Sequence, residues 1–154
     1  MRRDAHHPVA CAGAVAGLLA LAAPAAALAQ DARTPASYDG RWSVTLVCDD
    51  LKEEGRVVKG YEYRFFVDVR NGHLEGQYKA PGSPGSLTMT GTVVPDGGLQ
   101  ITADGITRHS EYTVGRVAQG THYTYTMEGR LSGTAGSARR RELRPCAARF
   151  AKPS

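Results

Sequence analysis

Tyrosine is the residue type with the clearest chemical pattern in this sequence. Five of the seven tyrosines fall at alternate positions of apolar–polar segments, and we expect them to face inward together with the single tryptophan. The set is Tyr61, Tyr63, Tyr78, Tyr123, Tyr125 and Trp42. A phenol joins a flat apolar ring to a hydroxyl, so such a set suits stacking on an aromatic or amphipathic ligand.

Glycines on the same faces bear on how the tyrosines are used. Gly76, Gly91 and Gly129 fall in register with the tyrosines and would leave space beside their rings. With that space the tyrosines line a cavity for a ligand. Without that space the tyrosines fill an ordinary core, and their hydroxyls form hydrogen bonds near the rims of the barrel.

Arginines are concentrated near the end of the chain. Arg139, Arg140, Arg141 and Arg144 form an expected basic patch, which suits weak contact with anionic envelope components or an acidic partner protein. Because side chains alternate in direction along a strand, at least one of the three consecutive arginines must point inward and be paired. Glu142 shares a face with Arg140, and an ion pair at the rim of the fold is the alternative use of these residues.

Signatures of catalysis and metal binding are absent from the sequence. The histidines after the leader lack metal-ligand spacing, the acidic cluster near residue 50 lacks the spacing of a calcium loop, and no Gly-x-Ser-x-Gly elbow occurs. These residues are His73, His109, His122, Asp49, Asp50, Glu53 and Glu54. We therefore expect no metal, no cofactor and no enzymatic activity.

The first 29 residues have the pattern of a Sec-type signal peptide. Two arginines precede an apolar run that ends in Ala27-Leu28-Ala29, a small-residue cleavage site, and an uncleaved anchor is the alternative. Cleavage would leave two cysteines, Cys48 and Cys146, in an oxidising compartment, where a disulfide is expected. We expect a periplasmic or secreted protein. The net charge of +4 is too small to indicate a nucleic-acid partner.

The first and last predicted strands position this disulfide. Trp42 and Cys48 share the inner face of residues 40–48, and Cys146 and Phe150 share a face of residues 145–152. If the two strands run antiparallel, Cys48 meets Cys146 while Trp42 lies at the Phe150 end. The closed loop of about 98 residues would be worth about 4 to 5 kcal/mol in the chain-entropy model.

Six further segments alternate between apolar and polar residues, and turn signals such as Asn71-Gly72 separate them. The eight predicted strands are residues 41–48, 61–70, 73–79, 86–94, 99–104, 121–132, 137–143 and 146–152. They predict an all-β fold, an eight-stranded antiparallel up-and-down barrel over residues 40–152, with a β-sandwich as the alternative. Residues 30–39 are expected to be a disordered leader.

Two connecting segments have weaker patterns. Residues 49–59 are charged and loop-like, with one helical turn expected around 51–54. Residues 104–120 are expected to hold either a short strand through Tyr112, Val114 and Arg116 or a long ordered loop.

Several stretches resemble small exported β-barrel proteins of alphaproteobacteria, which are mostly uncharacterised. These stretches are Tyr-Asp-Gly-Arg-Trp-Ser-Val at 38–44, Asn-Gly-His-Leu-Glu-Gly-Gln-Tyr at 71–78, Gly-Ser-Leu-Thr-Met-Thr-Gly at 85–91 and Arg-Pro-Cys at 144–146. The layout is also similar to periplasmic metalloprotease inhibitors and avidin-like binders, which open with a Gly-x-Trp strand. In the inhibitors a mobile N-terminal segment blocks the protease, and residues 30–37 are placed to act in that way.

Two functions follow as hypotheses. The first is a non-catalytic exported module that binds a small amphipathic or aromatic ligand, either inside the tyrosine-lined barrel or between the loops at its open end. The second is an inhibitor or interaction protein that contacts a protein partner through its N-terminal segment and loops. An interior pocket of several hundred Å³ favours the first, and a filled interior favours the second.

Overall fold

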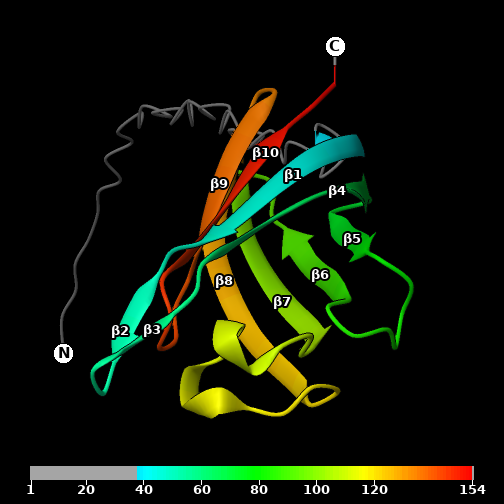
Figure 1. Cartoon of the computed structure of the whole chain (residues 1–154). Coiled ribbons are helices and arrows are strands. Elements are labelled where there is room, and N and C mark those ends of the chain that lie inside the picture. Colours follow the sequence, from blue (N-terminus) through cyan, green and yellow to red (C-terminus); the bar gives the residue numbers. More distant parts are fainter. Residues whose placement is uncertain (1–37, 154) are drawn as a thin grey trace, which may run out of the picture. The chain divides into compact units, whose positions relative to one another are not determined.

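Eight strands of alternating apolar and polar residues close into an antiparallel barrel (Figure 1). The computed structural model describes residues 38–153. The barrel strands are β1 (Gly40–Cys48), β4 (Tyr61–Arg70), β5 (His73–Tyr78), β6 (Leu87–Val93), β7 (Gly98–Ile106), β8 (His122–Ser132), β9 (Ala135–Arg140) and β10 (Cys146–Ala151). Neighbours along the chain pair in order, and β10 returns to β1. The expected up-and-down barrel is confirmed, and the alternative β-sandwich is wrong because the sheet has no free edge.

Closure of the barrel follows the register expected from the sequence. Cys48 on β1 lies opposite Cys146 on β10, and Val44 lies opposite Phe150. The two cysteines form a disulfide, with their Cα atoms 4.1 Å apart. The bond therefore joins the end of the first strand to the start of the last.

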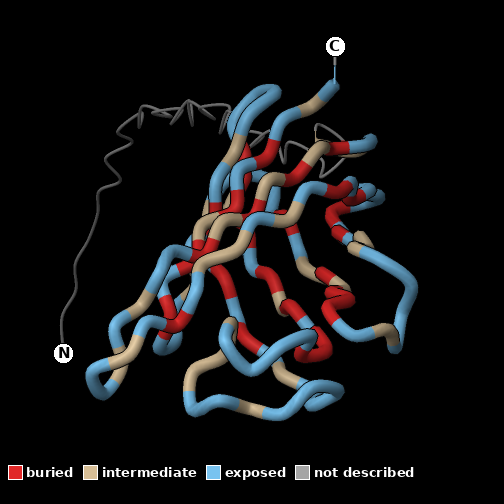
Figure 2. The backbone as a smooth tube through the Cα atoms, viewed as in Figure 1, coloured by how far each residue is buried: buried red, intermediate tan, exposed pale blue. Residues whose placement is uncertain are grey.

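The interior is packed at the end of the barrel that lies far from the disulfide. Buried and exposed residues alternate along the strands, as Figure 2 shows. Trp42 is fully enclosed there, and Phe150, Leu74 and Leu131 are also buried in the same core. The indole Nε1 of Trp42 donates a hydrogen bond of 2.9 Å to the Tyr38 carbonyl, so the ring is both packed and satisfied.

Tyr38 and Asp39 are the last two residues of the expected leader. Besides the bond from Trp42, the Asn71 amide donates to the Asp39 carboxylate at 3.0 Å, and the Lys152 ammonium donates to the Asp39 carbonyl at 2.7 Å. These contacts hold the two residues that precede β1 against the packed end of the barrel. The predicted signal peptide and residues 30–37 lie outside the described residues.

A two-stranded extension replaces the helical turn expected around residues 51–54. β2 (Leu51–Glu53) pairs with β3 (Arg56–Val58), and together they project beyond the barrel (Figure 1). Glu54 and Gly55 have positive φ angles of 46° and 79°, which form a tight hairpin turn rather than a helix. The expected helical turn is wrong because this Glu-Gly pair reverses the chain.

The segment between β7 and β8 is a long ordered loop. It contains two short 3-10 turns, η2 (Ser110–Tyr112) and η3 (Val114–Arg116), so the alternative of a short strand here is wrong. Gly115 and Arg116 have positive φ angles of 72° and 52°, which extended pairing does not allow. Within residues 38–153, no helix has the length and apolar character needed to cross a membrane.

Candidate functional site: the tyrosine pocket

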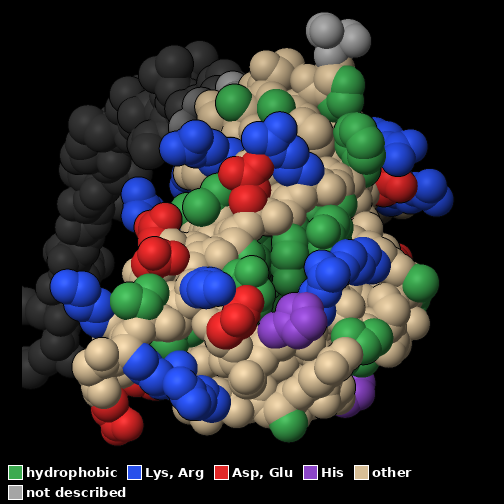
Figure 3. Space-filling model, in the orientation of Figure 1, with side chains coloured by type: hydrophobic (Ala, Val, Ile, Leu, Met, Phe, Trp, Pro, Cys, Tyr) green, Lys and Arg blue, Asp and Glu red, His purple; other side chains and the backbone are tan. Residues whose placement is uncertain are grey.

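The disulfide end of the barrel is hollow. A cavity of about 650 Å³ opens there, bounded by β4, β5, β8 and the loop between β7 and β8. Five tyrosines line it, one of which, Tyr112, comes from the loop. We call the site the tyrosine pocket after the four that lie on barrel strands: Tyr61, Tyr63, Tyr78 and Tyr123. Figure 3 shows a recess in which hydrophobic side chains gather, with basic side chains and a histidine at its edge.

The tyrosine rings are arranged as stacking surfaces. Tyr63 lies against Tyr78 with ring centroids 4.2 Å apart and planes 16° apart, and Tyr61 lies 4.7 Å from Tyr63 at 33°. The first pair is stacked and the second is tilted, so the three rings form one continuous aromatic cluster. Because Tyr61 and Tyr63 are two residues apart on β4, the strand itself directs both rings to the same side.

Gly105 leaves the space that the ring of Tyr123 occupies. The two residues are directly opposite on β7 and β8, and a Cβ atom at Gly105 would overlap the far edge of the Tyr123 ring. The missing side chain lets the ring lie flat over the neighbouring strand. The position of the Tyr123 ring in the pocket therefore depends on a glycine that is not itself a lining residue.

The two other aromatic residues predicted to bind ligand have different positions. Tyr125 is 2% exposed and lies one step deeper along β8, with its ring parallel to that of Tyr123 at 6.1 Å. Trp42 is six residues from Cys48 along β1, which places it in the packed end and outside the tyrosine pocket. Trp42 is thus a core residue in this fold, because the length of β1 separates it from the hollow end.

Burial keeps the phenols of this region neutral. Loss of solvent raises the pKa of Tyr63 to about 12, with Tyr61 and Tyr78 adding to the effect. Burial likewise raises the pKa values of Tyr61, Tyr123 and Tyr125 above the ordinary value of 10.0. At physiological pH these side chains are hydrogen-bonding hydroxyls on apolar rings, and they do not act as bases.

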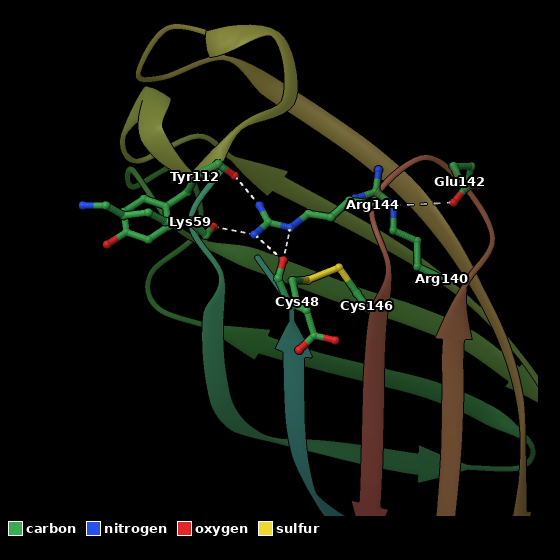
Figure 4. Close-up of a disulfide and its surroundings, with 8 residues drawn as sticks. Cys48, Lys59, Tyr112, Arg140, Glu142, Arg144 and Cys146 are labelled. Atoms are coloured by element: carbon green, nitrogen blue, oxygen red, sulfur yellow. Dashed lines mark hydrogen bonds and ion pairs between the residues drawn. A yellow bond between two sulfur atoms is a disulfide. The ribbon is translucent and has the colours of Figure 1, made fainter. Parts of the chain in front are cut away.

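Arg144 fastens the mouth of the pocket and does not form part of an exposed basic patch. It is 2% exposed and donates hydrogen bonds to three backbone carbonyls, those of Asp49, Lys59 and Tyr112 (Figure 4). The Tyr112 bond measures 2.7 Å. Burial lowers the pKa of the guanidinium, which keeps its charge at neutral pH because its reference value is so high. The prediction of an exposed patch through Arg144 is corrected, since carbonyls from three segments enclose the side chain.

The three consecutive arginines divide between the two faces of the barrel. Arg140 points inward and lines the pocket, with its guanidinium carbon 4.3 Å from the centre of the Tyr125 ring. Its Nε lies 3.8 Å from a Glu142 carboxylate oxygen, which confirms the expected ion pair. Arg139 and Arg141 are exposed on the outside, and Arg141 pairs with Glu128 at 2.9 Å.

Sequence reasoning missed the contribution of the loop between β7 and β8. Thr107, Arg108, His109 and Tyr112 from this loop line the pocket. They follow no period, so an argument from alternation cannot find them. The usable signal was the loop itself, because a long aperiodic segment between two strong strands is often functional.

Among residues 38–153, no three His, Cys, Asp or Glu side chains gather as metal ligands would.

Comparison with known proteins gives no further guide to this site. No protein-family model, curated protein or solved structure matches the chain. The function has to be inferred from the pocket.

Proposed function

We propose that the protein is a non-catalytic binding module that holds a small aromatic or amphipathic molecule in the tyrosine pocket. The observation that carries this proposal is the uneven filling of the barrel. One end is packed around Trp42, whereas the other keeps a cavity of about 650 Å³. That volume lies within the range of roughly 300 to 1,000 Å³ found for small-molecule sites.

The chemistry of the lining supports an aromatic ligand. Stacked phenol rings offer flat apolar surfaces, and their neutral hydroxyls offer hydrogen bonds at the rims. A ligand that stacks on the free faces of these rings would gain dispersion contacts with them and displace water from their apolar surface.

Export belongs to the same proposal. A disulfide between Cys48 and Cys146 is stable in an oxidising space, and the first 29 residues have the pattern of a signal peptide. A periplasmic or secreted module would meet its ligand outside the cytoplasm.

A protein partner is the second candidate function. Leu143 is 83% exposed and Val57 is 53% exposed, and both belong to segments near the hollow end of the barrel. Exposed apolar side chains of this kind suit contact with another protein. The two functions are separable, because only the first requires a small molecule in the tyrosine pocket.

The direct test is binding of an aromatic probe. We would titrate the protein with the neutral dye N-phenyl-1-naphthylamine and follow its fluorescence, and compare the Tyr63→Ala variant. One binding site is expected, with affinity about tenfold weaker in the variant because a stacking partner is lost.

Phe66→Ala is the matched control for this titration. Phe66 is an aromatic residue on the same strand as Tyr63, but it is 48% exposed on the outer face, under the guanidinium of Arg41. Its loss should leave dye affinity unchanged. Equal binding by wild type and Tyr63→Ala, with loss of binding in Phe66→Ala, would contradict the proposal. Native mass spectrometry of protein purified from its own host would then search for the retained natural ligand.

A further inference from the structure

We propose that the ligand of the tyrosine pocket is an aromatic acid, whose acidic group pairs with Arg140 while its ring stacks on the tyrosines. This inference rests on the proposed function and specifies the chemical class of the ligand. It follows from the hydrogen-bonding groups and the charges that face the cavity.

Buried polar atoms without partners gather at this pocket. In residues 38–153, four buried side-chain polar atoms have no hydrogen-bond partner in the protein. Three are at the hollow end, namely Thr107 Oγ1, the Tyr125 hydroxyl and Arg140 Nε, while the fourth, Asp39 Oδ1, is at the packed end. Proteins rarely leave such groups unpaired, because each costs about 1 to 3 kcal/mol.

All three atoms can donate a hydrogen bond. The Nε–H of Arg140 can only donate, and the hydroxyls of Thr107 and Tyr125 can do so by rotating. The Tyr125 hydroxyl is the least exclusive of the three donors, because it also faces the Tyr61 hydroxyl, and beyond the effect of burial this interaction raises the pKa of Tyr125 and lowers that of Tyr61. Thr107 and Arg140 line the cavity, and Tyr125 lies directly beneath the guanidinium of Arg140. The group that complements these donors is an acceptor, and an oxyanion accepts several such bonds at once.

Positive charge at the pocket is not neutralised by its own carboxylates. Both lining carboxylates are engaged elsewhere, since Glu62 pairs with Arg64 at 2.5 Å and Glu111 pairs with Lys59 at 3.4 Å. Among the described residues, neither Arg108 nor Arg144 has a carboxylate within ion-pair distance. The pocket therefore has an excess of guanidinium charge.

Glu142 compensates Arg140 only in part. Its carboxylate accepts hydrogen bonds from both the amide and the hydroxyl of Thr126, with the amide at 3.0 Å. At 3.8 Å the Nε of Arg140 is beyond hydrogen-bonding distance from it. The guanidinium is also stacked on Tyr125, so its plane is already oriented. An incoming carboxylate or sulfonate would pay little entropy to engage it.

Two dyes that differ in one group test this inference. N-phenyl-1-naphthylamine is neutral, and 8-anilino-1-naphthalenesulfonate has the same aromatic skeleton with one sulfonate. We expect the sulfonate to bind about tenfold or more tightly to wild type, as a charge-assisted hydrogen bond would provide. In Arg140→Met the ratio of the two affinities should fall to about one, whatever the change in affinity for the neutral dye.

Further variants separate the pocket charge from general surface charge. Arg139→Met removes the exposed neighbouring arginine and should keep the preference for the sulfonate. Arg140→Lys should show part of the preference for the sulfonate that Arg140→Met lacks, because lysine has the positive charge but not the planar, two-pronged donor set of a guanidinium. If Arg140→Met does not fold, the Arg140 Nε–H resonance of the wild type gives an independent readout, since it should shift on addition of the sulfonate dye and stay in place with the neutral one.

The outcomes distinguish the two proposals. Equal affinity of wild type for both dyes, with loss of binding in Tyr63→Ala, would overturn the acid preference and leave the aromatic pocket standing. Failure of both dyes to bind would overturn the binding function and the acid preference together. A preference for the sulfonate that persists in Arg140→Met and is lost in Arg139→Met would place the anion on the outer surface and contradict this inference.

Discussion

The guanidinium of Arg144 donates two hydrogen bonds to the carbonyl oxygen of Asp49, at 2.9 and 3.2 Å. Asp49 follows Cys48 directly, and Arg144 lies two residues before Cys146. The hydrogen bonds of Arg144, which we call the Arg144 clamp, therefore join the same two segments as the disulfide. Further bonds from Arg144 reach Lys59 and Tyr112, which belong to the frame of the pocket. The covalent closure of the barrel and the shape of its hollow end are thus parts of one connected structure.

Removing the disulfide should cost much of the folding stability. A bond that closes a separation of 98 residues is worth about 4 to 5 kcal/mol in the chain-entropy model. We expect the double variant Cys48→Ser/Cys146→Ser to unfold at a clearly lower urea concentration, and reduced wild type to behave in the same way. Identical urea midpoints for oxidised and reduced protein would show that the bond contributes nothing.

Replacing Arg144 should loosen the mouth of the pocket. Arg144→Met leaves three backbone carbonyls without their donor and removes a buried side chain, and we expect a loss on the order of 3 kcal/mol in the free energy of unfolding. The Lys59 amide, which donates to the Glu111 carbonyl at 2.9 Å, should exchange its hydrogen faster. Arg139→Met is the control, since an exposed arginine should change stability by less than about 0.5 kcal/mol. Similar exchange rates in both variants would refute the role of the clamp.

Gly105 and Tyr123 should be energetically coupled. Gly105→Ala forces the Tyr123 ring to move, so we expect it to destabilise the fold by about 1 to 3 kcal/mol and to weaken dye binding. With Tyr123→Ala already in place, the added methyl group has space and should cost much less. A double-mutant cycle measures this difference. Strictly additive effects would mean that the ring does not depend on the glycine.

The buried tyrosines should ionise at a higher pH than free tyrosine, and the free energy of unfolding should fall as they ionise. Because the pKa of Tyr63 is about 12 in the folded protein and 10.0 unfolded, the folded state binds more protons between these values. Stability from this group is therefore complete below pH 10 and declines as pH rises towards 12. Absorbance titration of tyrosinate should show the late ionisation, and Tyr63→Phe should remove one late step. Ionisation of all seven tyrosines near pH 10 would contradict this burial.

Alternation along the strands predicted most of the barrel, and the hollow end was harder to foresee. The inward positions of Tyr61, Tyr63 and Tyr123 follow from period two, and Cys48 with Cys146 gave the closing register. Period two says which face a residue occupies but not how far along the barrel axis the core extends. Trp42 was therefore grouped with tyrosines that lie at the opposite end.

Irregular segments limited the prediction in a second way. The enclosure of Arg144 depends on carbonyls from Asp49, Lys59 and Tyr112, which come together only after the loops fold. Backbone acceptors have no signature in a sequence. An arginine three residues after a run of three others is therefore assigned from the sequence to a surface patch, although its side chain has a structural role inside the protein.

A crystal structure of the protein with N-phenyl-1-naphthylamine bound would test the binding function most directly. We predict density for one naphthyl ring inside the tyrosine pocket, in contact with Tyr63 and Tyr123. Dye on the outer face against Phe66, with the pocket containing only solvent, would contradict it.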